Sequence, residues 1–186
     1  MLNIDLHSHS TVSDGLLSPE ELVQRAAARG VQMLALTDHD DMGGLARARQ
    51  AAIPYGVHLI NGVEVSVSWS SQTLHIVGLR IDPDCPALLQ GLQTIRSGRA
   101  ARAQRIAAEL EKSGIRGSLQ GAYQHAANPD LIGRTHFARF LVEQGQAGDV
   151  KGVFRKFLTP GKPGYIEHRW VALADAVSWI RESGGI

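Results

Sequence analysis

A series of side chains that can bind metal ions begins at the start of the chain. The first two, His7 and His9, lie two positions apart in Ile4-Asp5-Leu6-His7-Ser8-His9-Ser10. Side chains alternate across a strand, so both imidazoles point to one side, about 7 Å apart, and two histidines so placed can bind one cation. Asp5 shares that side and is a possible ligand or a partner that orients the imidazoles.

Further candidates follow along the chain. They are Asp14, His39, Asp40, Glu64 and His75. Imidazoles mixed with carboxylates suit zinc, manganese or iron better than calcium, which prefers oxygen ligands alone. A carboxylate such as Glu64 can bridge two metal ions that lie about 3.5–4 Å apart. A single histidine is more often a solvent-facing side chain, and His58, His125 and His168 are assigned no role.

The elements that position these side chains alternate between strand and helix. Leu2 to Leu6 has the period of a strand, and Ser18 and Pro19 begin a helix that Gly30 ends. The other expected elements are a buried strand at 31–37, a helix at 43–55 and apolar runs at 57–67 and 73–81. This order predicts a parallel α/β sheet or barrel, in which working groups lie at the carboxyl ends of the strands.

The middle of the chain changes to an almost wholly helical pattern. We expect helices at 88–113, 118–126, 135–144 and 149–157, with a break at Gly114. The predicted organisation is an N-terminal part of the barrel at 1–85, a helical insertion at 86–158 and a return to the barrel at 159–186. In the return, Tyr165 to Glu167 is expected to form a short strand and 171–183 a helix, whose buried side carries Ala172, Ala176, Val177 and Ile180.

Composition excludes several classes of protein. The chain has 186 residues, of which 44% are hydrophobic and 20% charged, as in a globular domain. Its net charge of +1 does not indicate a protein that coats double-stranded DNA or binds a membrane surface. Cys85 is the only cysteine, so a disulfide framework and a thiolate zinc site are excluded. The N-terminus lacks a signal-peptide pattern and no apolar run is long enough to span a bilayer, so we expect a cytoplasmic location.

The successive motifs resemble those of the polymerase and histidinol phosphatase (PHP) superfamily. They are Asp5-x-His7-x-His9-Ser10, Asp14-Gly15, Thr37-Asp38-His39-Asp40, Gly62-x-Glu64 and His75. In the helical region, Arg99-x-x-Arg102 and Ile132-Gly133-Arg134-x-His136 are similar to the TrpH/YciV-like branch. That branch includes 3',5'-nucleoside bisphosphate phosphatases and a 5'-to-3' exoribonuclease.

The resemblance implies a distorted seven-stranded α/β barrel, incomplete in this chain, that holds two or three divalent metals, most often manganese, with iron or zinc as alternatives. The implied ligands, which would also be catalytic through a hydroxide held by the metals, are His7, His9, Asp14, His39, Glu64 and His75, with Glu64 bridging. The implied substrate-binding residues are Arg99, Arg102, Arg134 and His136. Arginine suits this task because its planar fork binds phosphate through two hydrogen bonds, although a solvated helix face is the alternative for Arg99 and Arg102.

The resemblance also implies that residues are missing at the end. Proteins of this type supply another histidine after a Gly-Gly-Ile-like stretch and an Asp-x-His pair further on, and neither follows Ile186. We expect a polypeptide that ends at Ile186 to bind metal weakly and to hydrolyse poorly compared with a longer chain.

The leading functional hypothesis is a metal-dependent phosphoesterase that removes the 3'-phosphate of nucleoside 3',5'-bisphosphates. The same site could release nucleotides from the 5' end of short RNA. Two alternatives stay open: another phosphomonoesterase, similar to histidinol phosphatase, and a non-catalytic metal-binding or polymerase-associated module. The sequence does not predict the oligomeric state.

Overall fold

The computed structural model describes residues 2–70 and 72–186. The chain folds into two compact units. Unit 1 comprises Met1–Arg96 together with Arg169–Ile186, and unit 2 comprises Ser97–His168. Residues 86–96, which begin the expected helical insertion, thus belong to unit 1, because Leu88, Leu92 and Ile95 pack in its hydrophobic core.

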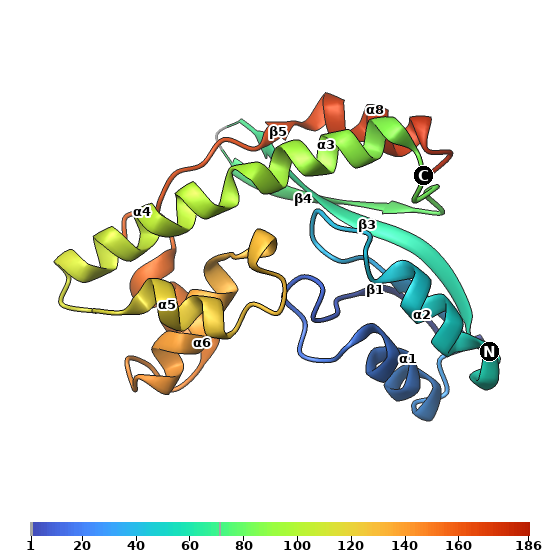
Figure 1. The fold of residues 1–186 in the computed structure, drawn as a ribbon, viewed down its shortest axis with the longest axis horizontal. Helices are drawn as coiled ribbons and strands as arrows, with labels where there is room; N and C mark the ends of the chain where they lie inside the picture. The colour runs from blue at the N-terminus through green and yellow to red at the C-terminus, as the bar shows by residue number, and fades with distance from the viewer. Residues whose placement is uncertain (1, 71) are drawn as a thin grey trace. The chain divides into compact units, whose positions relative to one another are not determined.

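A curled sheet forms the centre of unit 1 (Figure 1). Its strands are β1 (Ile4–Ser8), β2 (Met33–Leu36), β3 (His58–Trp69), β4 (Gln72–Leu79) and β5 (Val171–Ala172). They follow the order β1-β2-β3-β4, and β5 pairs with β3. The pairs β1–β2, β2–β3 and β3–β5 are parallel. The expected α/β fold with a partial barrel is therefore confirmed.

The last two apolar runs differ from the expected parallel arrangement. β4 runs antiparallel to β3, because β3 ends at Trp69 and β4 begins at Gln72, which leaves no room for the crossover that parallel strands need. His75 consequently lies within β4 and not at a carboxyl end. The expected strand at 165–167 is also wrong: these residues have no strand partner, and β5 begins at Val171.

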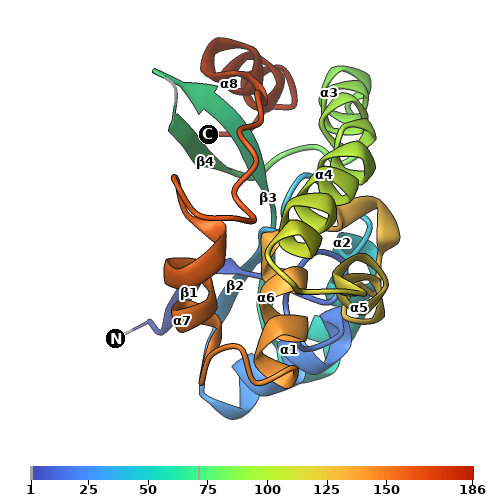
Figure 2. The ribbon, with the colours of Figure 1, turned by 90° about the vertical axis from the view of Figure 1, so that its left-hand side faces the viewer.

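Helices cover the sheet of unit 1. They are α1 (Pro19–Ala28), α2 (Leu45–Ala52) with a 3-10 turn (Ile53–Tyr55), α3 (Pro86–Ser97) and α8 (Leu173–Glu182). The predicted start of α1 is confirmed, since Ser18 and Glu21 form a reciprocal capping box. α8 packs against β3 and β4 (Figure 2). Its buried residues are Ala176 and Ile180, whereas Val177 and Ala172 are exposed, contrary to expectation.

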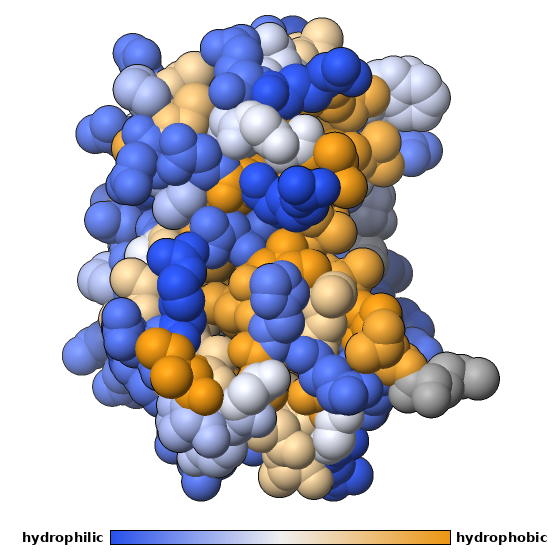
Figure 3. All heavy atoms as spheres, turned by 90° about the vertical axis from the view of Figure 1, so that its right-hand side faces the viewer, coloured by the Kyte–Doolittle hydropathy of each residue, from blue (hydrophilic) through white to orange (hydrophobic). Residues whose placement is uncertain are grey.

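The neighbouring strands β1 and β2 differ in burial. Leu34, Ala35 and Leu36 of β2 are buried, as expected for a strand covered on both faces. β1 exposes Ile4 and Leu6, and Leu2 before it is exposed as well, so the alternating pattern does not mark a buried face. The hydropathy of one face of the molecule is drawn in Figure 3, where apolar and polar side chains are interspersed.

Unit 2 is helical. Its elements are α4 (Arg99–Lys112), α5 (Ser118–Gln124), a 3-10 turn (Pro129–Leu131), α6 (Arg134–Glu143), α7 (Val150–Val153) and a π-helical turn, η3 (Phe154–Leu158). The predicted long helix at 88–113 is two helices, α3 and α4, separated at Gly98, a residue with low helix propensity. Phe137, Leu141 and Leu158 lie in its separate hydrophobic core. Among the described residues, no helix has the length and apolarity needed to cross a membrane.

Candidate metal centre

The strand arrangement of unit 1 brings the predicted ligands together. His7 and His9 lie at the end of β1 and just beyond it, and His39 follows β2. An isolated parallel bridge pairs His39 with Glu64 in the middle of β3. In the antiparallel pair, His75 of β4 is opposite Ser66, two residues from Glu64, and such diagonal neighbours lie within reach of long side chains.

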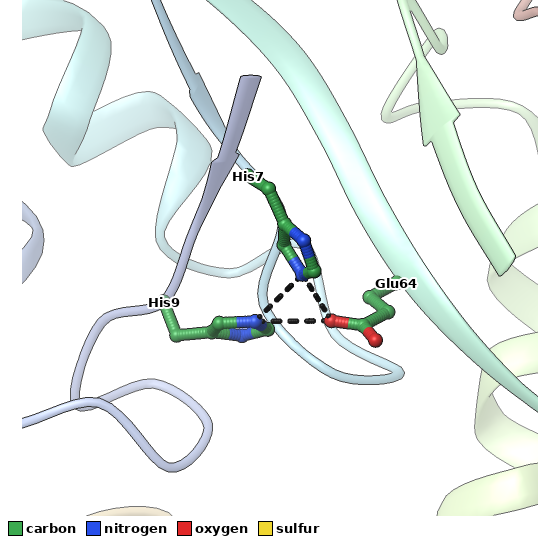
Figure 4. Close-up of side chains that lie close together, drawn as sticks. All are labelled: His7, His9 and Glu64. Carbon is green, nitrogen blue, oxygen red and sulfur yellow. Dashed lines mark hydrogen bonds and ion pairs between the residues drawn. The ribbon is translucent and has the colours of Figure 1, made fainter. Parts of the chain in front are cut away.

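The tightest group contains His7, His9 and Glu64 (Figure 4). Glu64 Oε2 lies 2.7 Å from His7 Nε2 and 3.0 Å from His9 Nε2, and the two Nε2 atoms are 3.1 Å apart. Two ligands about 2.1 Å from an ion and at right angles to each other are separated by about 3.0 Å. These three atoms therefore have the spacing of donors around a single cation.

Two further groups adjoin the first. One consists of His9, Asp14 and His39, and the other of His39, Glu64 and His75. His39 Nε2 lies 3.9 Å from Asp14 Oδ1, and His75 Nδ1 lies 3.6 Å from Glu64 Oε1. The rings of His9 and His39 stack with their centroids 4.6 Å apart. Because His9, His39 and Glu64 each belong to two groups, the donors can surround more than one closely spaced ion.

The donor set fits divalent transition metals. Nitrogen and carboxylate oxygen converge without sulfur, which suits manganese, iron or zinc. Glu64 presents Oε2 to His7 and His9 and Oε1 to His75, which is the arrangement of a bridging carboxylate.

At His39 and Glu64 the electrostatics favour the protonation states that metal ions require, which are a neutral imidazole and an ionised carboxylate. Burial lowers the pKa of His39 to about 4, so its imidazole is neutral at pH 7. Burial would raise the pKa of Glu64, but hydrogen bonds from His9 and His7 and the neighbouring His39 outweigh it and lower the pKa to about 2.

Two candidates lie outside these groups. The Asp5 carboxylate accepts a hydrogen bond from the backbone N–H of His7 at 3.2 Å, which supports a role in orienting His7 through the backbone rather than through its ring. The Asp40 carboxylate is turned toward Ser66. Neither residue belongs to a donor group among the described residues.

The residues predicted to bind substrate phosphate gather in unit 2. Arg99 and Arg102 are buried on α4, and the guanidinium Nη1 of Arg99 lies 3.5 Å from the position of a Cβ on Gly133. Arg134 begins α6, and its Nη1 donates to the carbonyl of Leu158 at 3.1 Å. Burial, together with the charges of Arg134 and Arg99, lowers the pKa of Arg102 to about 10.

The same cluster includes the predicted His136, and its environment favours an anion. His136 is buried, and its Nδ1 accepts a hydrogen bond from the backbone N–H of Gly133 at 3.0 Å. A phosphate placed among these guanidinium groups would offset their mutual repulsion. The alternative of a solvated helix face is therefore wrong for Arg99 and Arg102.

Sequence analysis missed two members of this cluster. Burial, and then the charges of Arg102 and its neighbours, lower the pKa of His168 to about 4, and Tyr165 interacts electrostatically with Arg102 and Arg134. Both residues lie far from α4 in the sequence, so no local pattern could have indicated the contact.

Two other histidines that were assigned no role lie outside both clusters. His125 forms an ion pair with Glu143 at 3.2 Å, and His58 is exposed at the start of β3.

The curled α/β sheet brings together histidines and carboxylates that are able to bind divalent metal ions. The chain belongs to the PHP domain family, whose sequence profile matches residues 5–182. The superfamily resemblance seen in the motifs is thus confirmed.

Similar proteins come from several bacteria. A 3',5'-nucleoside bisphosphate phosphatase of Chromobacterium violaceum is 57% identical over 186 residues, which are 100% of this chain and 65% of that protein. The 5'-3' exoribonuclease Rnm of Escherichia coli K12 is 46% identical over 97% of this chain and 62% of its own length. The chain therefore spans less than two thirds of the length of these relatives.

Solved structures share the fold. One of an amidohydrolase from Chromobacterium violaceum, with bound sulfate and no metal, has a TM-score of 0.97 and 57% identity, and the match covers 99% of this chain and 65% of that one. A second, from Bifidobacterium adolescentis, has a TM-score of 0.92 at 23% identity and covers 100% of this chain and 65% of its own. This second likeness concerns the fold alone.

Proposed function

We propose that this chain carries the metal centre and the phosphate-binding residues of a phosphoesterase that hydrolyses the 3'-phosphate of nucleoside 3',5'-bisphosphates. The observation that carries the proposal is the convergence of His7, His9 and Glu64, with donor atoms 2.7–3.1 Å apart, inside a set of three overlapping donor groups. The 57% identity to a 3',5'-nucleoside bisphosphate phosphatase supports the choice of substrate.

In this proposal the ligands are the six residues of the three groups, with Glu64 as the bridge. They are His7, His9, Asp14, His39, Glu64 and His75. Bound divalent ions supply Lewis-acid chemistry: they neutralise charge on the phosphate and lower the pKa of water. The neutral His39 and the ionised Glu64 are ready to accept them at pH 7. We further propose manganese as the resident metal, with iron or zinc as alternatives, and a cytoplasmic location.

The arginines of unit 2 are proposed to hold the phosphates of the substrate. Three buried or half-buried guanidinium groups, those of Arg99, Arg102 and Arg134, lie in one cluster, and each can donate two parallel hydrogen bonds to phosphate oxygens. His136 follows Arg134 on α6 and is proposed to act with them. Hydrolysis then breaks the bond between phosphorus and the 3' oxygen, and releases inorganic phosphate and a nucleoside 5'-phosphate. A substrate with a second phosphate is expected to bind more tightly than a monophosphate.

The test is product analysis with adenosine 3',5'-bisphosphate and Mn²⁺. We expect inorganic phosphate and the 5'-monophosphate, slower turnover of the 3'-monophosphate and none of histidinol phosphate. The variant His39→Ala removes a shared donor and should abolish turnover, whereas His58→Ala removes an exposed histidine outside the cluster and should leave turnover unchanged. Turnover of histidinol phosphate alone would favour the other phosphomonoesterase.

A second candidate activity is 5'-to-3' exoribonuclease activity on short RNA, favoured by the 46% identity to Rnm. Both reactions hydrolyse a phosphoester at the 3' oxygen of a nucleotide, so one centre can perform both. Release of mononucleotides from a 5'-phosphorylated oligoribonucleotide, lost together with bisphosphate hydrolysis in His39→Ala, is the expected result. If His39→Ala keeps binding to a protein partner and the wild type hydrolyses neither substrate, the chain is a non-catalytic module.

A further inference from the structure

Two carboxylates flank His39 and are not members of any donor group among the described residues. Asp38 is 2% exposed and Asp40 is 0% exposed. Burying a carboxylate costs free energy unless hydrogen bonds compensate for the lost water, so the partners of these two side chains indicate what their burial achieves.

Asp38 holds the loop that follows β1. Its Oδ1 accepts hydrogen bonds from the backbone N–H of Ser10 at 2.7 Å and from the hydroxyl of Ser13 at 2.6 Å. Its Oδ2 accepts one from the hydroxyl of Ser10 at 2.6 Å. Ser10 follows His9 and Ser13 precedes Asp14 in the chain, so the Asp38 carboxylate fixes the ends of the loop segment that carries both donors.

Asp40 holds the other neighbour of the His39 segment, which is β3. Its Oδ1 accepts a hydrogen bond from the backbone N–H of Ser66 at 2.7 Å, and its Oδ2 accepts one from the Ser66 hydroxyl at 2.8 Å. Its backbone N–H donates to the carbonyl of Glu64 at 3.0 Å. These bonds fix β3 at Glu64 itself and at Ser66, two residues further along the strand.

The backbone of Asp40 is itself held in an unusual conformation. Its φ is 51°, in the left-handed region that non-glycine residues rarely adopt. Arg96 Nη1 donates to the Asp40 carbonyl at 2.7 Å, and residues in such conformations persist when the surrounding structure determines them. The turn after His39 is thus determined by its backbone and side-chain contacts together.

We propose that Asp38 and Asp40 are positioning residues of the metal centre: they bind the β1 loop and β3 to the segment of His39, and so preset the spacing of the donors. This inference rests on the proposed function only for the identity of the bound ion. Donors in the three groups come from segments far apart in the sequence, and these two carboxylates connect the segment of His39 to the loop after β1 and to β3 through their side chains. Residues that orient metal ligands contribute roughly 10–100-fold to metal affinity.

The experiment measures Mn²⁺ affinity, from the free-ion signal in electron paramagnetic resonance, for Asp38→Asn and Asp40→Asn. An amide in place of a carboxylate keeps the shape but removes the charge and replaces one acceptor oxygen with an N–H donor, so the serine hydroxyl that it faces must turn from donating to accepting. We expect the dissociation constant to rise by about 10–100-fold in each variant. Affinities within twofold of the wild type in both variants would overturn the proposal.

A matched control separates positioning from loss of stability. Ser183 is buried in unit 1 and its hydroxyl donates to the Ile180 carbonyl at 2.7 Å, remote in sequence from the donors. Ser183→Ala removes a buried hydroxyl, as Ser13→Ala and Ser66→Ala do. Ser13→Ala and Ser66→Ala should weaken Mn²⁺ binding several-fold, and Ser183→Ala should not. Equal losses of affinity in all three would show a merely structural role.

Conservative variants keep the test decisive where an Asn variant fails to fold. Ser13→Thr retains the hydroxyl that donates to Asp38, so it should restore most of the affinity that Ser13→Ala loses. Failure of this rescue, with a melting temperature equal to that of the wild type, would contradict the positioning role. If the variants weaken Mn²⁺ binding but the wild type hydrolyses no nucleotide, the proposed function fails and the positioning role stands. A wild-type chain that binds no Mn²⁺ overturns both.

Discussion

The two units gather side chains that favour ions of opposite charge. In unit 1, imidazoles and carboxylates converge around Glu64 of β3, and the pKa of Glu64 falls to about 2 because imidazoles surround it. In unit 2, guanidinium groups converge among helices, and the pKa of Arg102 falls to about 10 because burial and like charges disfavour its cationic form. The first cluster is suited to cations and the second to anions. The proposed phosphoesterase would use both.

The largest effect is expected from the shared donor of unit 1. Glu64→Gln removes the charge that two of the donor groups share, so Mn²⁺ affinity should fall by more than the roughly 100-fold limit typical of residues that only orient ligands. Isothermal titration with MnCl₂ measures it. The anion cluster of unit 2 should be unaffected, so retained phosphate binding with lost metal binding is the expected pair of results. If Glu64→Gln bound Mn²⁺ as tightly as the wild type, the donor groups would not be the metal site.

The next effect concerns the arginines of unit 2. Arg102→Ala removes a buried guanidinium, and charge-assisted hydrogen bonds contribute about 1.5–3 kcal/mol, so the dissociation constant for adenosine 3',5'-bisphosphate should rise by roughly 10–100-fold. Arg116→Ala, which removes an exposed arginine of the same unit, is the control and should change it less than twofold. Equal effects of the two variants would indicate non-specific attraction by the net charge.

A smaller effect is expected from the loop between His9 and Asp14. A Cβ on Gly15 would lie 2.3 Å from the carbonyl oxygen of His9, closer than atoms can pack, so Gly15→Ala must displace the loop. Mn²⁺ affinity should fall about tenfold, within the range for residues that orient ligands. Gly148→Ala introduces a methyl group where no atom lies within 4 Å and serves as the control. An unchanged affinity in Gly15→Ala would show that the loop does not set the donor spacing.

The smallest effect belongs to His168 in unit 2. Its pKa is lowered from 6.5 to about 4, so the folded state binds fewer protons than the unfolded state between these values. The contribution of His168 to stability is therefore full above pH 6.5 and is lost as the pH falls toward 4. The nuclear magnetic resonance signal of its ring Hε1 proton should titrate well below pH 6.5. A midpoint at or above 6.5 would place His168 away from the arginines.

The sequence predicted unit 1 better than unit 2 because its signals are local. The period of β1, the cap at Ser18 and the apolar run of β2 each identify an element without reference to the rest of the chain, and the motif order brings His7, His39 and Glu64 into one cluster. The antiparallel direction of β4 follows from the short connection after Trp69. An alternating pattern of side chains does not by itself indicate the direction of a strand.

Long-range contacts account for what sequence analysis missed. The strand at Val171 exists because it pairs with Val67 of β3, more than a hundred residues earlier, whereas 165–167 has the composition of a strand and no partner. The burial of Asp38 and Asp40 was likewise not predictable, since a carboxylate beside a candidate ligand is indistinguishable in sequence from another ligand. Their serine partners become informative only when the fold brings them close.

In this account, donors on β1, β3 and β4 and on the segments that follow β1 and β2 form one cage for several divalent ions. The most direct measurement is anomalous diffraction at the manganese edge from crystals of this chain soaked in MnCl₂. We predict more than one peak within the cluster, at least one of them about 2.0–2.4 Å from Glu64 and from the imidazoles of His7 and His9. Peaks confined to the surface, with none at bonding distance from Glu64, would contradict the claim.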